Sequence, residues 1–336
     1  MDRQSVKFGA VPKSLVCTFA GCWVILGTLL FGHPSFADEA PAAGAAVDAA
    51  KADAAKPDTP KPDAQKYKLA YLFVPGQEVH FKVKNASKIH IQRNGVEEIV
   101  ENSSETDRHF KVMAVAPGGN GDLELSIDRV HMSARFNDGA EEIFKSDDPK
   151  FHHPKFKQVL ASVGKPQAVI SFSPTGRVVN VKANQGAVAQ AAKADDDAHE
   201  TYLSPLPEEP IAIGTGWKEE FELRVTQERL SVKIRMTRRY TLADVKDGVA
   251  LINFSTYVIT PVNDPAIEAQ LIQRKTKGQL QFDIAQGMVI ARIVAVPRDS
   301  IIEPFGAKSS MSAESTYEER LIPAKVAGKS TETAAK

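Results

Sequence analysis

The chain has 336 residues, and its 42 basic and 42 acidic side chains give a formal net charge of zero at pH 7. This balance gives no electrostatic reason to expect nucleic acid or an acidic membrane surface as a partner. The 2 cysteines, Cys17 and Cys22, both lie in an N-terminal apolar segment. If that segment is removed, disulfides, thiol catalysis and thiolate metal sites are excluded from the mature chain.

Residues 1–37 are typical of an export signal. Basic residues precede an apolar run from Leu15 to Phe31, and the small residues Ser35 and Ala37 predict cleavage after Ala37. Two alternatives stay open: Cys22 could be lipidated, although the apolar run continues beyond it, or the run could remain as a short membrane anchor. We therefore expect an exported protein, periplasmic or extracellular, that meets a membrane only if this segment is retained or lipidated.

Low-complexity segments divide the rest of the chain. Residues 38–66 repeat Ala, Pro, Lys and Asp and cannot bury enough apolar surface to fold, which predicts a disordered linker. Residues 183–203 lack a hydrophobic face and form either a second linker or an exposed helix. Residues 324–336 are expected to be a disordered tail. The two folded modules are therefore expected at residues 67–182 and 204–323.

The first module is predicted to be an antiparallel meander with one helix. Alternation from Val79 to Val83 indicates a strand, and Asn94-Gly95 is a strong hairpin signal. A polar break is expected from Asn102 to Asp107. Apolar residues at helical spacing predict a short amphipathic helix from Pro154 to Val163, and the turn from Ser173 to Gly176 predicts a closing hairpin.

The second module opens with the most regular alternation in the chain, from Gly216 to Val262. A four-residue loop from Thr226 to Arg229 sets apolar residues opposite apolar ones and acids opposite bases. The expected cross-strand pairs are Val225–Leu230, Leu223–Val232, Phe221–Ile234, Glu222–Lys233 and Glu220–Arg235. This hairpin specifies a fold and no chemistry.

Further strands are expected along the second module. The stretch from Val249 to Ile259 is apolar on both faces in its first half, which predicts a central strand. Strands are also predicted at Leu271 to Thr276, Leu280 to Ile284, Met288 to Val296 and near Thr316 to Ile322.

The two modules share a spacing of glycine and aromatic residues. Phe172 precedes Gly176 much as Phe282 precedes Gly287, and the first strand of each module follows a glycine, Gly76 or Gly216. A diverged duplication explains this similarity, and convergent strand-and-turn chemistry is the alternative. The predicted fold class is therefore mainly β, with two similar antiparallel modules that could curve into half-barrels and one or two short helices.

The sequence predicts no catalytic residue, no cofactor and no metal site. Ser162 and Lys165 have the spacing of a serine nucleophile with a lysine base, but the companion motifs are missing. His80 and His90 are interpreted as solvated histidines on strand faces. A weak metal site at the adjacent pair His152-His153 is less favoured, because neighbouring side chains point apart.

Two further polar clusters carry little signal. Asp147 and Asp148 lie near the histidine pair and could only supplement a weak site. The run from Asp195 to His199 lacks the glycine and distal glutamate of a calcium loop, so it is interpreted as a solvated charge run.

Four aromatic residues are the candidate ligand-binding residues. Trp217 stands at the start of the most regular hairpin, and Tyr67, Tyr71 and Phe73 lie on the expected first strand. Packing in the protein core is the alternative interpretation for all four.

Short motifs give the chain a resemblance to known proteins. The lead from Leu203 to Pro207 into Gly214 to Trp217, together with the Phe282 to Ile290 hairpin, resembles an uncharacterised family of exported bacterial β-rich proteins, a domain of unknown function. A more distant similarity is to lipoprotein-carrier folds, in which a curved antiparallel sheet wraps a hydrophobic ligand. The first resemblance covers Tyr67 to Pro323 and implies no catalytic residue.

Three functions follow from these observations. The favoured one is an exported, non-enzymatic binding or structural protein of the bacterial cell envelope, whose ligand or partner is unknown. The first alternative is a carrier that holds a lipid or another hydrophobic ligand in a curved β-sheet. The second alternative is a hydrolase with an unrecognised site.

Overall fold

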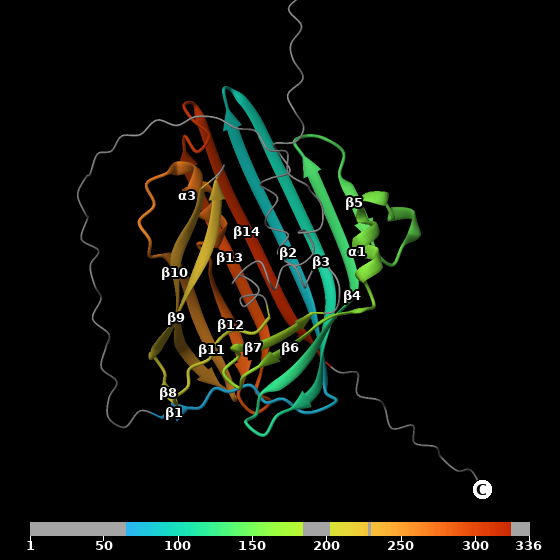
Figure 1. Ribbon diagram of the computed structural model, residues 1–336, viewed down its shortest axis with the longest axis vertical. Coiled ribbons are helices and arrows are strands. Elements are labelled where there is room, and N and C mark those ends of the chain that lie inside the picture. Colours follow the sequence, from blue (N-terminus) through green and yellow to red (C-terminus); the bar gives the residue numbers. More distant parts are fainter. Residues whose placement is uncertain (1–64, 184–201, 228–229, 324–336) are drawn as a thin grey trace, which may run out of the picture.

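A computed structural model of the chain describes residues 65–183, 202–227 and 230–323 (Figure 1). Most of the expected signal segment, linkers and tail lies outside these residues. The fold is mainly β, and a single 12-stranded antiparallel sheet dominates it. The strand order is β7-β6-β4-β3-β2-β14-β13-β12-β11-β10-β9, and the short strand β5 pairs with β4.

The strands differ widely in length. The sheet consists of β2 (Glu78–Arg93), β3 (Val96–Val115), β4 (Gly121–Phe136), β5 (Glu142–Lys145), β6 (Pro166–Phe172), β7 (Val178–Ala183), β9 (Gly216–Gln227), β10 (Leu230–Lys246), β11 (Val249–Val258), β12 (Lys277–Asp283), β13 (Met288–Ile302) and β14 (Ser309–Ile322). Two more strands, β1 (Lys66–Tyr67) and β8 (Ile211–Ala212), form a separate small pair.

The sheet is open and curved. Strands β7 and β9 are its two edges, and Figure 1 shows the sheet bending so that both edges stand in front of the central strands. Strands β2 to β7 and strands β9 to β13 follow one another along the sheet in the same direction. Strand β14 lies between β2 and β13 and so joins the two halves. This common strand order does not test the duplication expected from the sequence, which stays a prediction.

Two short helices cover parts of the concave face. Helix α1 (Lys157–Ser162), which follows the 3-10 turn η3 (Pro154–Phe156), packs Val159 against Ile127 and Phe144. The helix expected at residues 154–163 is therefore confirmed, and its first turn is a 3-10 turn. A further 3-10 turn, η2 (Pro149–Phe151), precedes it.

The second helix corrects the strand expected from Leu271 to Thr276. Helix α3 (Pro265–Leu271) and the 3-10 turn η5 (Ile272–Arg274) occupy this stretch instead. Asp264 caps the helix by accepting a hydrogen bond of 2.8 Å from the Ala266 amide, and Pro265 suits its first position. A short apolar run does not tell a strand from a buried helix, and here the capping residues decide.

The polar break expected from Asn102 to Asp107 is wrong, because β3 runs through it without interruption. Its polar side chains find partners on the neighbouring strands. Glu105 pairs with Lys82 at 3.2 Å and with Arg129 at 2.8 Å, and Asp107 also pairs with Arg129 at 2.8 Å. Cross-strand ion pairs thus replace the apolar contacts that a strand was expected to need.

The hairpin of β9 and β10 has a register that differs from the expected one. Gln227 lies opposite Leu230, so Val225 faces Val232 rather than Leu230. The four-residue loop is therefore wrong, and the ladder is two pairs longer at its closed end, because Thr226 and Gln227 are also paired. Two-residue connections match the twist of paired strands better than longer ones. A shift of two residues keeps every side chain on its expected face.

The ion pairs expected in this hairpin nevertheless form. Lys233 Nζ lies 3.2 Å from Glu222 Oε2, and Arg235 Nη2 lies 3.3 Å from Glu220 Oε2. In the observed register, however, Glu222 lies opposite Arg235, so both ion pairs are diagonal contacts. Long side chains reach diagonal partners, and for this reason charge matching alone does not determine a register.

Strand β11 is central, as expected, but only one of its faces is buried. Ala250, Ile252 and Phe254 are buried, whereas Val249 and Leu251 on the other face are half-buried. The apolar run therefore predicts the position of the strand and overestimates its burial.

Candidate functional site

The lower end of the concave face is closed by a segment that we call the strap, residues 65–77, which includes β1. Its backbone is tied to two hairpin turns of the sheet. The Tyr71 amide donates to the Pro174 carbonyl at 2.7 Å, and the Leu72 amide donates to the Gly287 carbonyl at 3.1 Å. Figure 1 shows β1 and the strap crossing below β7, β11 and β12. The strap thus bridges the β6–β7 turn and the β12–β13 turn.

Both turns have a glycine where the strap crosses. Gly176 and Gly287 have positive φ angles of 76° and 62°. A Cβ at Gly176 would lie 2.6 Å from the Tyr71 ring, and a Cβ at Gly287 would overlap the Leu72 side chain. These are the two glycines whose similar spacing suggested a duplication. Their common structural role is to let the strap approach closely.

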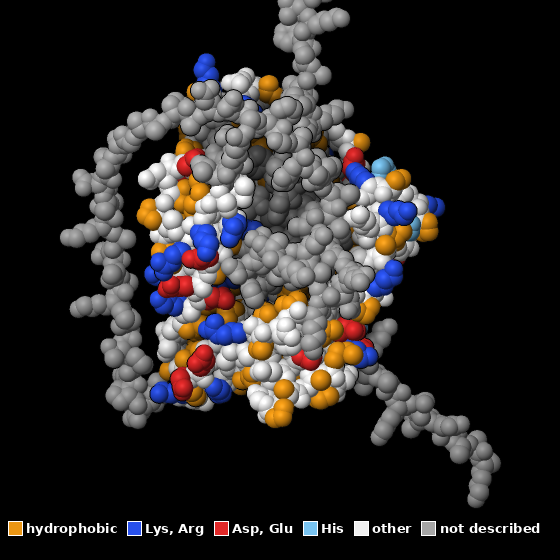
Figure 2. Space-filling model, in the orientation of Figure 1, with side chains coloured by type: hydrophobic (Ala, Val, Ile, Leu, Met, Phe, Trp, Pro, Cys, Tyr) orange, Lys and Arg blue, Asp and Glu red, His pale blue; other side chains and the backbone are white. Residues whose placement is uncertain are grey.

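Above the strap, the concave face holds a cavity of about 50 Å³. Strands β2, β3, β4, β13 and β14 form its floor. The strap and residues Tyr202 to Ser204 cover it. Its apolar lining includes Phe81, Phe110 and Leu123. Figure 2 shows apolar side chains gathered at this lower end and charged ones over β9 and β10.

The cavity has one charged end, where Arg292 and Glu319 contribute to its lining. Arg292 Nη2 lies 2.7 Å from Glu319 Oε2, and Arg108 Nη2 donates to the other oxygen of the same carboxylate. Tyr317 accepts hydrogen bonds from Arg292 at 3.1 Å and from Arg108 at 3.3 Å. All three charged side chains are buried, with exposures of 2% for Arg108, 6% for Arg292 and 3% for Glu319. We call these four residues the arginine cluster.

Electrostatics keep the arginine cluster ionised. Burial raises the pKa of Glu319, but the guanidinium groups of Arg108 and Arg292 outweigh it and hold this pKa below its usual value. Burial lowers the pKa of Arg108, and the Glu319 carboxylate outweighs that effect, so its pKa is raised. On the strap, burial raises the pKa of Tyr71, which stays neutral and donates to the Ser204 carbonyl at 2.9 Å.

Arg108 has unused hydrogen-bonding capacity. Its Nη2 donates to Glu319 and Tyr317, whereas Nε and Nη1 are buried and have no hydrogen-bond partner among the described residues. Its guanidinium carbon lies 5.6 Å from the centre of the Phe110 ring, which lines the cavity. A buried donor without an acceptor costs about 1–3 kcal/mol. An acceptor brought by a ligand would remove this cost.

The structure places two of the four predicted aromatic residues at the cavity. Tyr71 and Phe73 line it from the strap, and their rings are 6.2 Å apart and nearly parallel. Tyr67 pairs with Ile211 between β1 and β8 and packs against the neighbouring core.

Trp217 is held by the protein itself. Its indole Nε1 donates to the Pro205 carbonyl at 3.0 Å, and its ring stacks on Tyr240 at 5.2 Å. It therefore anchors the segment from Leu203 to Pro207 to β9, and it does not line the cavity.

The weaker motifs do not assemble into a site among the described residues. Ser162 Oγ donates to the Val159 carbonyl at 2.7 Å at the end of α1, which is a helix-end contact. His152 lies 3.3 Å from the Ser146 carbonyl, and His153 accepts from the Lys155 amide at 3.3 Å. The run from Asp195 to His199 lies outside the described residues.

The arginine cluster was missed by the sequence reasoning. Arg108 precedes Phe110 by two positions, and Glu319 precedes Leu321 by two positions, so each charge falls on the apolar face of its strand. The sequence did contain a signal for the cluster: a charged residue on the apolar face of a predicted strand indicates a buried, paired charge. The pairing of β2 with β14 was not predictable, because it joins the two ends of the folded chain.

Comparison with known proteins gives fold-level similarity alone. No protein-family model and no curated protein matches the chain. A structure titled "Lipid-protein interactions in lipovitellin" is similar to 75% of this chain and 25% of that chain, with 12% identity and a TM-score of 0.43. The chain thus spans about a quarter of the length of lipovitellin.

Two further structures are similar at a lower level. DynF of the dynemicin biosynthesis pathway of Micromonospora chersina has 6% identity over 86% of this chain and 92% of that one, with a TM-score of 0.20. A putative outer membrane lipoprotein-sorting protein domain from Vibrio parahaemolyticus has 8% identity over 76% and 87% of the chains, with a TM-score of 0.15. The weak similarity to lipoprotein carriers expected from the sequence is therefore present and concerns the fold alone.

Within residues 65–183, 202–227 and 230–323, no helix is long and apolar enough to cross a bilayer.

Proposed function

We propose that the protein is an exported, non-enzymatic binding protein of the bacterial cell envelope that carries a hydrophobic ligand with one anionic end. The ligand lies on the concave face, with its apolar part between the strap and the sheet. Its anionic end meets the arginine cluster. The N-terminal segment, typical of an export signal, supports the location.

The observation that carries this proposal is the cavity with apolar walls and one buried cationic end. Ligand sites combine a mainly apolar lining with a few convergent polar groups that fix orientation. Here Phe81, Phe110 and Leu123 supply the apolar part. Arg292 and Glu319 line the charged end, and Arg108, which pairs with Glu319 behind them, has two buried donors without an acceptor among the described residues. Carboxylates are the preferred partners of guanidinium groups.

Ligand entry requires the cover to move. The cavity of about 50 Å³ is far smaller than the roughly 300–1,000 Å³ of typical ligand sites. The floor belongs to strands held by continuous ladders, whereas Tyr71 to Gln77 and Tyr202 to Ser204 cover it outside the main sheet. Displacing these segments costs fewer backbone hydrogen bonds than separating strands, so the ligand enlarges the cavity from the strap side.

The apolar part of the site is tested with cis-parinaric acid, a fluorescent fatty acid. We expect saturable binding to the purified protein with one probe per chain, and recovery of the probe unchanged after long incubation. Val79 lines the cavity from β2, so Val79→Phe fills it and should weaken binding at least 10-fold. Val100→Phe is the matched control, because Val100 is also half-buried on the same face of the β2–β3 hairpin and lies outside the cavity lining.

Two results would overturn the proposal. One is the absence of saturable binding by a folded protein. The other is equal binding by Val79→Phe, Val100→Phe and the unchanged protein, because binding would then not involve the cavity.

A further inference from the structure

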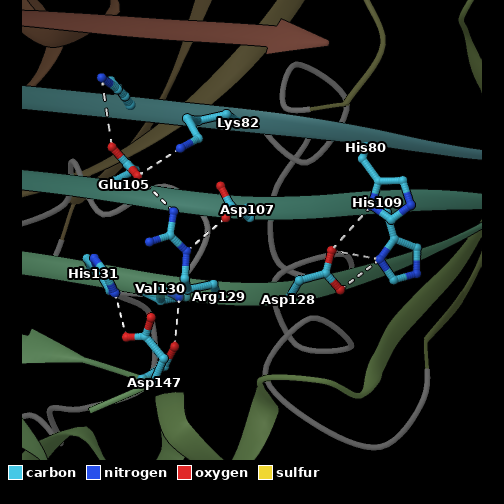
Figure 3. A network of polar contacts seen from close by, with 12 residues as sticks. His80, Lys82, Glu105, Asp107, His109, Asp128, Arg129, Val130, His131 and Asp147 are labelled. Atoms are coloured by element: carbon cyan, nitrogen blue, oxygen red, sulfur yellow. Dashed lines mark hydrogen bonds and ion pairs between the residues drawn. The ribbon is translucent and has the colours of Figure 1, made fainter. Parts of the chain in front are cut away.

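A second polar site lies on the opposite, convex face of the sheet. His80 of β2 lies directly opposite His109 of β3, and their rings are 5.0 Å apart. Asp128 of β4 completes the group: its carboxylate oxygens lie 2.8 and 2.9 Å from His109 Nδ1, and Oδ2 lies 3.7 Å from His80 Nδ1. Figure 3 shows the three side chains converging from three neighbouring strands.

A β-bulge places the carboxylate. Asp107 pairs with Arg129 and Arg108 pairs with Ile127, so Asp128 is the extra residue of β4. Bulges redirect side chains and occur often beside functional sites. The bulge directs the Asp128 side chain toward both histidines. In a regular strand, Asp128 would not lie beside this pair.

The partners of Asp128 distinguish it from other carboxylates on this face. Glu101 and Glu105 each pair with two or more Lys or Arg side chains. Asp128 has two imidazoles as its ion-pair partners among the described residues, and no Lys or Arg. Two imidazoles and one carboxylate form a metal-ligand set, whereas the neighbouring carboxylates are paired with Lys or Arg.

The dimensions suit a small transition-metal ion. One ligand atom from each residue lies within 4.8 Å of the others, and among the described residues these three side chains are close enough together to hold an ion. Zinc binds nitrogen and oxygen at about 2.0–2.2 Å in tetrahedral geometry, which sets its ligand atoms about 3.3 Å apart. The side chains of His80, His109 and Asp128 are 44%, 20% and 37% exposed, so an ion can reach them.

The surroundings leave one position open. Glu78 Oε2 lies 3.9 Å from His80 Nε2, and Lys111 holds the other oxygen of Glu78 at 3.1 Å. Glu78 thus lies beside Nε2 of His80 and would add negative charge near a bound ion. A water molecule would take the fourth position, as in zinc sites with three protein ligands.

We propose that His80, His109 and Asp128 form a zinc-binding site that ties β2, β3 and β4 together on the convex face. The site uses none of the residues of the proposed ligand cavity, so the two proposals stand or fall separately. Binding to the folded chain stabilises it by mass action.

The test is a calorimetric titration with zinc chloride of metal-stripped protein that carries no histidine tag. We expect one ion per chain with a micromolar Kd and a higher melting temperature with zinc. His109→Gln and Asp128→Asn should each weaken binding at least 10-fold. His131→Gln is the matched control, because His131 also lies on the convex face and pairs with a single carboxylate, that of Asp147.

A second control changes the histidine of the run from Asp195 to His199, which lies outside the described residues. His199→Gln should leave zinc binding unchanged. The inference is overturned if the unchanged protein takes up no zinc, if His109→Gln binds as tightly as the unchanged protein, or if His131→Gln or His199→Gln removes the binding. These side chains are partly exposed, so we expect each variant to keep the sheet. Circular dichroism of each variant checks that it is folded.

Discussion

The guanidinium of Arg108 on β3 donates to the buried carboxylate of Glu319 on β14, although 211 residues separate them in sequence. β2 lies between the two strands, so the contact crosses one strand of the sheet and links the early strands to the last one. The same contact supplies the charged end of the cavity. The cluster therefore both joins distant strands and forms the charged end of the proposed ligand site.

Glu319→Gln should destabilise the protein strongly. The change leaves Arg108 and Arg292 buried without a countercharge, and breaking a buried ion pair typically costs about 3–5 kcal/mol. Glu318→Gln is the control, because Glu318 lies on the opposite face, is 38% exposed and pairs with the exposed Arg320. It should change the free energy of unfolding by less than about 0.5 kcal/mol. Urea unfolding measures both; equal effects would contradict the role given to the cluster.

Acid should weaken the ion-pair ladder on the convex face (Figure 3). Burial raises the pKa of Glu105, but Lys82 and Arg129 outweigh it and lower this pKa. A carboxyl whose pKa is lower in the folded state stabilises above the unfolded pKa and loses that contribution as pH falls through the folded one. The difference in unfolding free energy between the unchanged protein and Glu105→Gln should therefore shrink below about pH 4.5. A difference that grows on acidification would refute this assignment.

The strap should be sensitive to its two glycines. Gly176→Ala and Gly287→Ala add a Cβ that collides with Tyr71 or Leu72 at a position with positive φ. We expect each to cost about 1–3 kcal/mol. Gly164→Ala is the control, because Gly164 has a φ of 73° and open space around it, so it reports the backbone cost alone. If thermal unfolding shows the same loss for all three variants, close approach of the strap is not the reason for the glycines.

The β9–β10 register can be read out with engineered disulfides. In a chain without Cys17 and Cys22, Val225→Cys with Val232→Cys places two cysteines directly opposite each other, within reach of a disulfide. Val225→Cys with Leu230→Cys sets them diagonally. Mild oxidation followed by thiol counting should show a bond in the first variant and free thiols in the second. Free thiols in the first variant and a disulfide in the second would instead support the register expected from the sequence, in which Val225 lies opposite Leu230.

The sequence predicted the local parts of this fold well. The Asn94-Gly95 turn and the Ser173 to Gly176 turn depend on neighbouring residues, and each occurs where its turn residues indicate. Two predictions failed where the local sequence fits two structures, a strand or a helix in one case and two hairpin registers in the other. A capped helix replaced the strand expected from Leu271 to Thr276, and a two-residue shift of the β9–β10 register kept every face and every ion pair.

The sites were less accessible to sequence reasoning. The arginine cluster depends on β2 meeting β14, a long-range pairing without a local signal. The histidine pair, in contrast, was within reach: the Asn94-Gly95 hairpin, continued through β3, sets His80 opposite His109. Because a break was expected from Asn102 to Asp107, the predicted pairing of the two strands stopped before His109. The pair of His80 with His109 was therefore not predicted.

The acid-to-ester preference of Arg108→Met shows whether the arginine cluster receives the anionic end of the ligand. The dissociation constants of cis-parinaric acid and its methyl ester, measured by fluorescence on the unchanged protein and on this variant, separate the charged end from the apolar part. The unchanged protein should prefer the acid at least 10-fold, as expected for a charge-assisted hydrogen bond. Arg108→Met should lose this preference while still binding the ester. Equal binding of acid and ester by the unchanged protein, or an undiminished preference in Arg108→Met, would contradict the account.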